Sequence, residues 1–231
     1  MSLRPRIAVV TFPGSLDDGD MRLALELIGA EPVPLWHADE RLPDEIGAVV
    51  LPGGFSHGDY LRCGALAKLA PVMRSVHAFA TAGGPVLGVC NGFQILCEAG
   101  LLPGVLRANR QLEYVCCDVT ISVEETVATM LSDLEPGTAL GLPIKHGEGN
   151  WYTDDETFAE IADRGQIAFR YLADVNGSRD LVAGVCNEAG NVLGLMPHPE
   201  HAVDRLLGPV GGAQVLEGLV TAARDHLGVA A

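Results

Sequence analysis

Residues 85–96 read PVLGVCNGFQIL, an apolar run that passes through a glycine-flanked cysteine into a helical pattern. The apolar segment 85–89 is typical of a buried strand, and residues 91–99 have the composition of a helix. A strand that turns into a helix within so few residues belongs to parallel sheets that helices cover on both faces. This stretch therefore predicts an α/β fold.

The same alternation extends on both sides of this stretch. Apolar runs and helical periodicity predict strands at 6–12, 31–36 and 47–52, helices at 18–30, 64–82 and 212–227, a hairpin over 182–197, and an antiparallel extension within 111–145. Pro32 and Pro34 favour an edge position for their strand, and Pro71 is expected to divide its helix. We expect one three-layer domain over residues 1–231, with a mostly parallel, doubly wound, flavodoxin-like sheet.

The composition excludes several classes of function. The net charge is −15, which argues against binding to nucleic acid or to anionic lipid. The uncharged stretch from Ser75 to Cys97 is long enough to span a bilayer, but Gly83-Gly84-Pro85 interrupts it with a turn, so it is expected to be buried in protein. The N-terminus lacks the pattern of a secretory signal, and we expect a cytoplasmic protein.

Cysteine spacing predicts neither a metal site nor disulfides. The six cysteines are Cys63, Cys90, Cys97, Cys116, Cys117 and Cys186, and none forms a C-x-x-C pair. Most lie in apolar strings, as small buried side chains do. Buried cysteines that need not form disulfides fit a reducing compartment.

Cys90 is the candidate nucleophile. Gly88 and Gly92 flank it as in the G-x-nucleophile-x-G elbow, where larger side chains would collide in the strained turn. The helix that follows would direct its N-terminal dipole at the sulfur and favour the thiolate. The alternative is a merely buried cysteine, which is the better interpretation of Cys97.

His198 is the candidate base, and Glu200 is the candidate acid that orients it. His198 lies between two prolines in Met196-Pro197-His198-Pro199-Glu200, directly after an apolar strand. The prolines stiffen the loop, and a carboxylate two residues further on can hold the imidazolium. An ordinary surface turn is the alternative, and His201 is the competing histidine.

Glycines after a second strand offer an oxyanion hole. Leu51-Pro52-Gly53-Gly54-Phe55 ends the strand at 47–52, at the same sheet edge as the elbow. Attack on an amide creates an oxyanion that needs fixed N–H donors, and the amides of Gly54 and Asn91 are the candidates. Taken alone, the two glycines are only a turn.

These motifs resemble a known family. The segments Gly88–Gln94 and Pro197–Glu200 are similar to those of class I (triad) glutamine amidotransferases, and the long loop Leu51–Gly64 resembles the glutaminase subunits of phosphoribosylformylglycinamidine synthase. His146–Gly149 and Phe12–Ser15 fit the same subunits. The resemblance covers about residues 6 to 225. It departs at Leu16-Asp17, where such subunits often carry Asn-Cys, and the sequence assigns no chemistry to this position.

The resemblance implies a class I glutamine amidotransferase-like fold, glutamine as the substrate and a γ-glutamyl thioester on Cys90. It further implies hydrolysis to glutamate and ammonia, with Gly53, Gln94 and His146 as candidate substrate contacts and no metal in this chain. Ammonia would pass to a large synthetase subunit that uses ATP and Mg in de novo purine synthesis, with a small bridging subunit in the same complex. The chain has no phosphate-binding loop of its own.

Two questions stay open at this point. In the loop at 53–64, His57, Asp59 and Arg62 could pair with one another or contact the substrate or a partner, and the same holds for His146. The alternative functions are a non-catalytic regulatory partner that keeps the fold, and a glutaminase that serves another synthetase.

Overall fold

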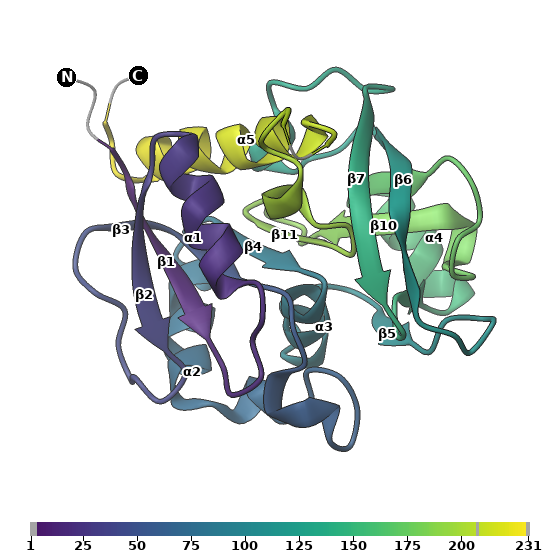
Figure 1. Ribbon diagram of the computed structural model, residues 1–231, viewed down its shortest axis with the longest axis horizontal. Coiled ribbons are helices and arrows are strands. Elements are labelled where there is room, and N and C mark those ends of the chain that lie inside the picture. The colour runs from purple at the N-terminus through teal and green to yellow at the C-terminus, as the bar shows by residue number, and fades with distance from the viewer. Residues whose placement is uncertain (1–3, 207, 230–231) are drawn as a thin grey trace.

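The computed structural model describes residues 4–206 and 208–229 and contains a nine-stranded mixed sheet with the order β2-β1-β3-β4-β11-β10-β9-β6-β7 (Figure 1). The parallel strands are β1 (Arg6–Thr11), β2 (Glu31–Trp36), β3 (Ile46–Leu51), β4 (Val86–Val89) and β11 (Val192–Leu195). The antiparallel strands are β6 (Val115–Val123), β7 (Ala139–His146), β9 (Ile167–Tyr171) and β10 (Val182–Cys186). The predicted parallel sheet with an antiparallel extension is confirmed.

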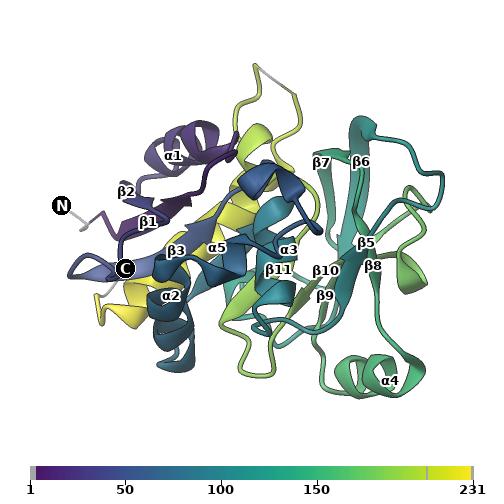
Figure 2. The ribbon, with the colours of Figure 1, turned by 90° about the horizontal axis from the view of Figure 1, so that it is seen from below.

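Helices cover the parallel part of the sheet, and α1 lies on the opposite side from α2 (Figure 2). The α-helices are α1 (Asp18–Leu27), α2 (Pro71–Thr81), α3 (Asn91–Glu98), α4 (Asp155–Asp163) and α5 (Gly211–His226). The described residues also include the 3₁₀ turns η1 (Ser56–Asp59), η2 (Ala67–Leu69), η3 (Thr129–Leu131), η4 (Arg179–Leu181) and η5 (Pro199–His201). No helix in the described ranges is long and apolar enough to cross a membrane.

Most sequence-based boundaries agree with the structure to within a few residues. Pro71 begins α2 and separates it from η2, β2 is an edge strand, and β10 pairs with β11 as a hairpin. Four elements were not predicted from the sequence: α4, β9 and the short pair β5 (Val105–Arg107) and β8 (Asn150–Tyr152). The apolar stripe of α4 is short: Ile161 is its one buried side chain and Phe158 is partly buried, so the nine-residue helix gives a weak periodic signal.

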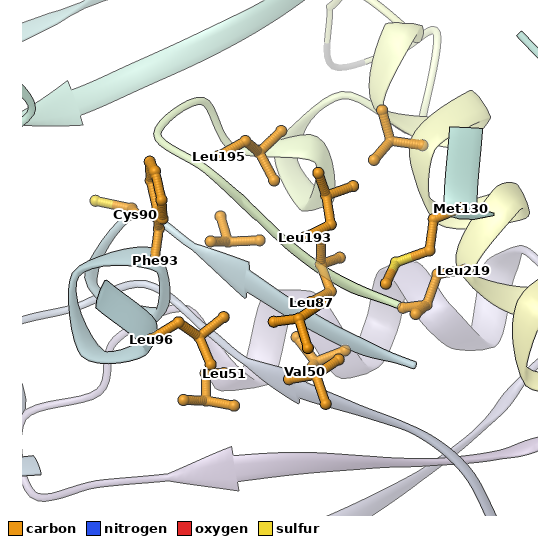
Figure 3. Close-up of a cluster of buried hydrophobic side chains, with 14 of the residues drawn as sticks. Val50, Leu51, Leu87, Cys90, Phe93, Leu96, Met130, Leu193, Leu195 and Leu219 are labelled. Carbon is orange, nitrogen blue, oxygen red and sulfur yellow. The ribbon is translucent and has the colours of Figure 1, made fainter. Parts of the chain in front are cut away.

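The apolar core ends at the nucleophile turn. Strands β3 and β4 are buried along their whole length. Figure 3 shows Leu87, Leu193 and Phe93 packed in this core, with Cys90 at its end and its sulfur directed away from the cluster. Cys90 is itself buried at the edge of this cluster, so the core fixes the backbone of the turn while the sulfur faces away from the other apolar side chains.

Gly92 provides a test of this packing. A Cβ at Gly92 would lie 1.8 Å from the carbonyl oxygen of Leu51, which is backbone of the neighbouring strand and cannot move aside cheaply. We predict that Gly92→Ala lowers the free energy of unfolding by about 3 kcal/mol. Gly19→Ala, in open space on α1, is the control and should stabilise by up to about 1 kcal/mol. Urea unfolding measures both, and equal effects would contradict the packing argument.

Candidate active site

Four neighbouring parallel strands end at one edge of the sheet and deliver the candidate residues. The loops after β1, β3, β4 and β11 carry Asp17, Gly54, Cys90 and His198, and these strands are adjacent in the order β1-β3-β4-β11. Open α/β sheets bind ligands at the carboxyl ends of their strands. Residues far apart in the chain therefore converge because of the strand order.

Cys90 occupies the strained position that the elbow predicts. Its backbone has φ 50° and ψ −105°, in the left-handed region that non-glycine residues rarely adopt. The amide of Cys90 donates to the carbonyl of Leu195 at 2.8 Å, which ties the turn to β11. A Cβ at Gly88 would lie 2.8 Å from the backbone of Gly92, so both flanking glycines are needed. Cys90 also directly precedes α3, so the positive end of the helix dipole lies beside its side chain.

His198 is fully buried and paired with Glu200. Its Nδ1 lies 2.6 Å from Oε1 of Glu200, while Nε2 has no hydrogen-bond partner among the described residues. Burial alone would lower the pKa of His198, but the charges of Glu200 and of the Cys90 thiolate outweigh it and raise this pKa to about 10. An imidazolium at neutral pH follows, with its second N–H available to the sulfur or to a leaving group.

Two cavities meet at the thiol. Cys90 and His198 together line a cavity of about 30 Å³, which agrees with the prediction that their loops converge. A larger cavity of about 160 Å³ opens beside it. Its lining residues are Gly54, Phe55, Asp59, Cys63, Cys90, Gln94, Tyr114, Lys145, His146, Gly147 and Glu148. The larger cavity is the candidate substrate pocket.

The geometry at Gly54 and Asn91 is compatible with an oxyanion hole. Within the described part of the chain, neither amide donates a hydrogen bond to a protein acceptor, and Asn91 is the first residue of α3, where amides have no partner within the helix. Gly54 has φ 143° and is fixed by its neighbour, because the amide of Phe55 donates to Gly14. Their role in binding an oxyanion stays a prediction.

The three candidate substrate contacts have different surroundings. Gln94 and His146 line the larger cavity, whereas Gly53 lies beneath Asp17 and His198, where its missing side chain makes room for both. The side chain of Gln94 is already engaged: its Oε1 accepts from Nδ2 of Asn91 at 2.8 Å, and its Nε2 donates to the backbone carbonyl of Glu148 at 2.7 Å. The substrate contacts of all three residues stay predictions.

His146 is a neutral histidine with one free ring nitrogen. Its Nδ1 lies 3.1 Å from Oδ1 of Asn109, and its buried Nε2 has no partner among the described residues. Burial, and secondarily the charge of His198, lowers the pKa of His146 to about 4. Since Asn109 Oδ1 can only accept, Nδ1 donates to it, and Nε2 is left as a hydrogen-bond acceptor at the cavity wall.

Sequence reasoning missed two charged residues of the site. Asp17 lies 3.7 Å from Nδ1 of His198 and forms an ion pair with Lys145. Lys145 lines both cavities and raises no sequence signal, because it stands in an ordinary strand pattern. Asp17 had one available signal: it follows a parallel strand at the same sheet edge as the nucleophile.

His57, Asp59 and Arg62 of the loop at 53–64 do not pair with one another; each contacts a residue outside the loop. Arg62 binds Glu98 of α3 through two contacts of 2.5 and 2.7 Å, and the His57 ring packs edge-on against His37. Asp59 accepts from Asn91 at 3.4 Å and borders the larger cavity. Of the three, only Asp59 faces the candidate substrate pocket.

A cluster beside the triad has the proximity of a metal site. Ligand atoms of Asp17, His198, Glu200 and His201 all lie within 4.8 Å of one another. However, Asp17 is ion-paired with Lys145, and Nδ1 of His198 is hydrogen-bonded to Glu200. A lysine ammonium in contact with the carboxylate already supplies the positive charge that a cation would bring, so ion pairing accounts for this cluster.

Comparisons with known proteins agree with this geometry. Residues 4–214 match the family model described as the CobB/CobQ-like glutamine amidotransferase domain. A phosphoribosylformylglycinamidine synthase subunit PurQ of Corynebacterium jeikeium is 56% identical over 88% of this chain and 91% of the relative. The PurQ subunit of Rubrobacter xylanophilus is 52% identical over 95% and 99%. A chain in the structure of PurLQS from Thermotoga maritima has a TM-score of 0.87 at 40% identity, covering 95% of this chain and 99% of that one.

The site predicts which thiol reacts. Burial raises the pKa of both Cys63 and Cys97, whereas Cys90 stands at a helix N-terminus beside an imidazolium. We predict that one equivalent of a glutamine-like electrophile modifies Cys90 before any other cysteine at pH 7, as peptide mass spectrometry would show. Glutamine should protect it, and Cys90→Ser should abolish the fast labelling. Modification at Cys63 or Cys97 first would identify a different nucleophile.

Proposed function

The chain belongs to the CobB/CobQ-like glutamine amidotransferase family, within it to the PurQ subunits of phosphoribosylformylglycinamidine synthase, and on this premise we propose that Cys90, His198 and Glu200 are its catalytic triad. The proposal takes the whole chain as one glutaminase domain that acts in the cytoplasm. The observation that carries it is the convergence of Cys90 with the buried His198–Glu200 pair at one sheet edge.

Acylation begins with the thiolate of Cys90. Its sulfur attacks the side-chain amide carbon of glutamine, and the resulting oxyanion takes hydrogen bonds from the amides of Gly54 and Asn91. When the C–N bond breaks, Nε2 of His198 gives its proton to the leaving nitrogen. The products of this half-reaction are ammonia, a γ-glutamyl thioester on Cys90 and a neutral His198.

Deacylation returns the site to its starting charges. Neutral His198 takes a proton from water, the hydroxide adds to the thioester, and the C–S bond breaks to release the γ-carboxylic acid, which loses its proton to solvent and becomes glutamate. The imidazolium and the thiolate are then both restored. Glu200 fixes the ring through Nδ1 during both half-reactions, as the acid of other triads does.

The larger cavity suits the amino-acid end of glutamine. Asp59 and Glu148 lie in its wall and offer negative charge to an α-ammonium group. Burial, together with the nearby charge of Glu148, raises the pKa of Asp59, so a bound cation would be favourable there. Gln94 and the free acceptor nitrogen of His146 complete the polar wall of the proposed subsite.

An exposed apolar rim beside the site supports docking of the rest of the synthase. The rim consists of the large exposed side chains around the cavity mouth and on the adjoining loops, namely Leu16, Phe55, Tyr60, Leu61, Leu112 and Tyr114. Such clusters typically mark protein interfaces. We assign this rim to the large synthetase subunit, which would use ATP and Mg and receive the ammonia, with a small bridging subunit in the same complex.

The central test replaces the nucleophile. Cys90→Ala should lower glutamate release, measured with the synthetase subunits present, at least about a thousandfold while the far-UV spectrum stays unchanged. Cys97→Ala, in the helix α3 that follows Cys90 but outside the two cavities, is the matched control and should keep its turnover. Wild-type protein that binds its partners without hydrolysing glutamine would instead indicate the regulatory alternative.

The rim has its own test. Leu61 is 88% exposed, so Leu61→Asp should fold normally but place a charge in the docking surface. We predict at least a tenfold loss of the stimulation of glutamine hydrolysis by the synthetase subunits, because a buried unpaired charge costs several kcal/mol at an interface. Leu27→Asp, 61% exposed at the far end of α1, should leave the stimulation intact. Equal stimulation of both variants would place the partner elsewhere.

A further inference from the structure

Asp17 occupies a helix-capping position without capping the helix. It directly precedes α1, where a carboxylate ordinarily accepts hydrogen bonds from the first helical amides. Its side chain makes no such bond and is only 3% exposed. A buried carboxylate that does not bond the helix amides needs other hydrogen-bond or ion-pair partners, and in the structure these come from distant parts of the chain.

These partners are the groups around the triad. Oδ2 of Asp17 lies 3.7 Å from Nδ1 of His198, and Oδ1 lies 3.2 Å from Nε2 of His201. Oδ1 also forms the ion pair with Lys145 of β7. The carboxylate therefore connects the loop after β1 with η5 and with the antiparallel part of the sheet.

The backbone beneath Asp17 is shaped to bring it against His198. A Cβ at Gly53 would lie 2.4 Å from Oδ2 of Asp17 and 2.7 Å from Cε1 of His198. Both side chains therefore pack over the same bare Cα. Any larger residue at Gly53 would push one of them away, so the carboxylate and the ring are held together by shape as well as by charge.

We propose that Asp17 is a positioning residue for the glutaminase reaction, a second carboxylate that acts with Glu200 to keep the His198 ring charged and directed at Cys90. This inference rests on the proposed function of the triad. Asp17 touches neither the thiol nor the candidate substrate pocket, since it lines only the small cavity between Cys90 and His198. Its effect on the reaction is exerted through the imidazole.

The charge balance gives the direction of this effect. The titratable groups that face His198 and Asp17 from all surrounding elements are Cys90, Tyr114, Lys145, His146, Glu200 and His201. Burial alone would raise the pKa of Asp17, but His201, His198 and Lys145 outweigh it and hold this pKa well below its usual range. Asp17 is therefore an anion throughout the working range of pH and favours the imidazolium.

The test is a titration of His198 in the full chain carrying ¹³Cε1-labelled histidine. Asp17→Asn keeps the shape and removes the charge, so the imidazolium loses an anionic neighbour and the deprotonation of His198 should move to lower pH by roughly 1 unit. Asp18→Asn is the matched control, because it removes the same charge from the next residue, which pairs instead with Arg22. That variant should leave the titration unchanged.

A second variant separates the two roles of Asp17. Lys145→Met removes the cation that offsets Asp17, so the His198 titration should move to higher pH. If Asp17 served only to anchor Lys145, both variants would move it in the same direction, and the proposal would fail. If Asp17→Asn does not fold, Asp17→Ser, which also removes the charge at this position, takes its place, and an unchanged His198 titration in the folded variant overturns the proposal.

Kinetics link this titration to the reaction. In the complex with the synthetase subunits, the alkaline limb of kcat/KM for glutamine should follow the shift of the His198 titration in Asp17→Asn and stay in place in Asp18→Asn. Because the titration needs no turnover, it tests Asp17 even if the wild-type chain hydrolyses no glutamine. A wild type without activity would count against the proposed function alone.

Discussion

The reversal of the chain at Cys90 is the constraint on which the site depends. A strand must become a helix within one residue, and this residue takes a backbone conformation with φ 50°. Such strain costs on the order of 1–3 kcal/mol and persists only where the surroundings over-determine it. Here the surroundings are β3 and β11 on either side of β4, the bond from Cys90 to Leu195, and the close approach of Gly92 to Leu51. The apolar core thus holds a reactive thiol in a position that the local chain would not choose.

Charge is the second constraint, because the groups around the thiol are buried. Two carboxylates, Asp17 and Glu200, lie within ion-pair distance of a single histidine. Like charges this close would raise one another's proton affinity unless cations were present. Lys145 and the imidazolium supply them and balance the two carboxylates, so that the thiolate alone remains as the net negative charge of the site. This arrangement explains why the structure brings β7 of the antiparallel extension to the edge of the parallel sheet.

Sequence reasoning succeeded where the signal is local. The order of strands and helices up to α3, the elbow at Cys90 and the proline-bounded His198 each follow from a few neighbouring residues, and in the structure Cys90 follows β4 and His198 follows β11. It failed where the meaning of a residue depends on tertiary neighbours. Asp17 looks like an ordinary cap, and only the packing over Gly53 reveals its contact with His198. Arg62 likewise found its partner on α3, 36 residues away, and not within its own loop.

The loop that carries much of the apolar rim is physically tied to the nucleophile turn. The amide of Ser56 donates to the Asn91 side chain at 3.0 Å, and that side chain in turn donates to Asp59. At the other end of α3, Glu98 holds Arg62 of the same loop. His57, Asp59 and Leu61 in this loop all have positive φ, so the conformation is strained and kept in place by these bonds. A protein that binds Tyr60 and Leu61 would therefore contact the loop whose Ser56 and Asp59 are hydrogen-bonded to Asn91, the residue directly after Cys90. These hydrogen bonds offer a direct physical connection between a docked partner and the nucleophile.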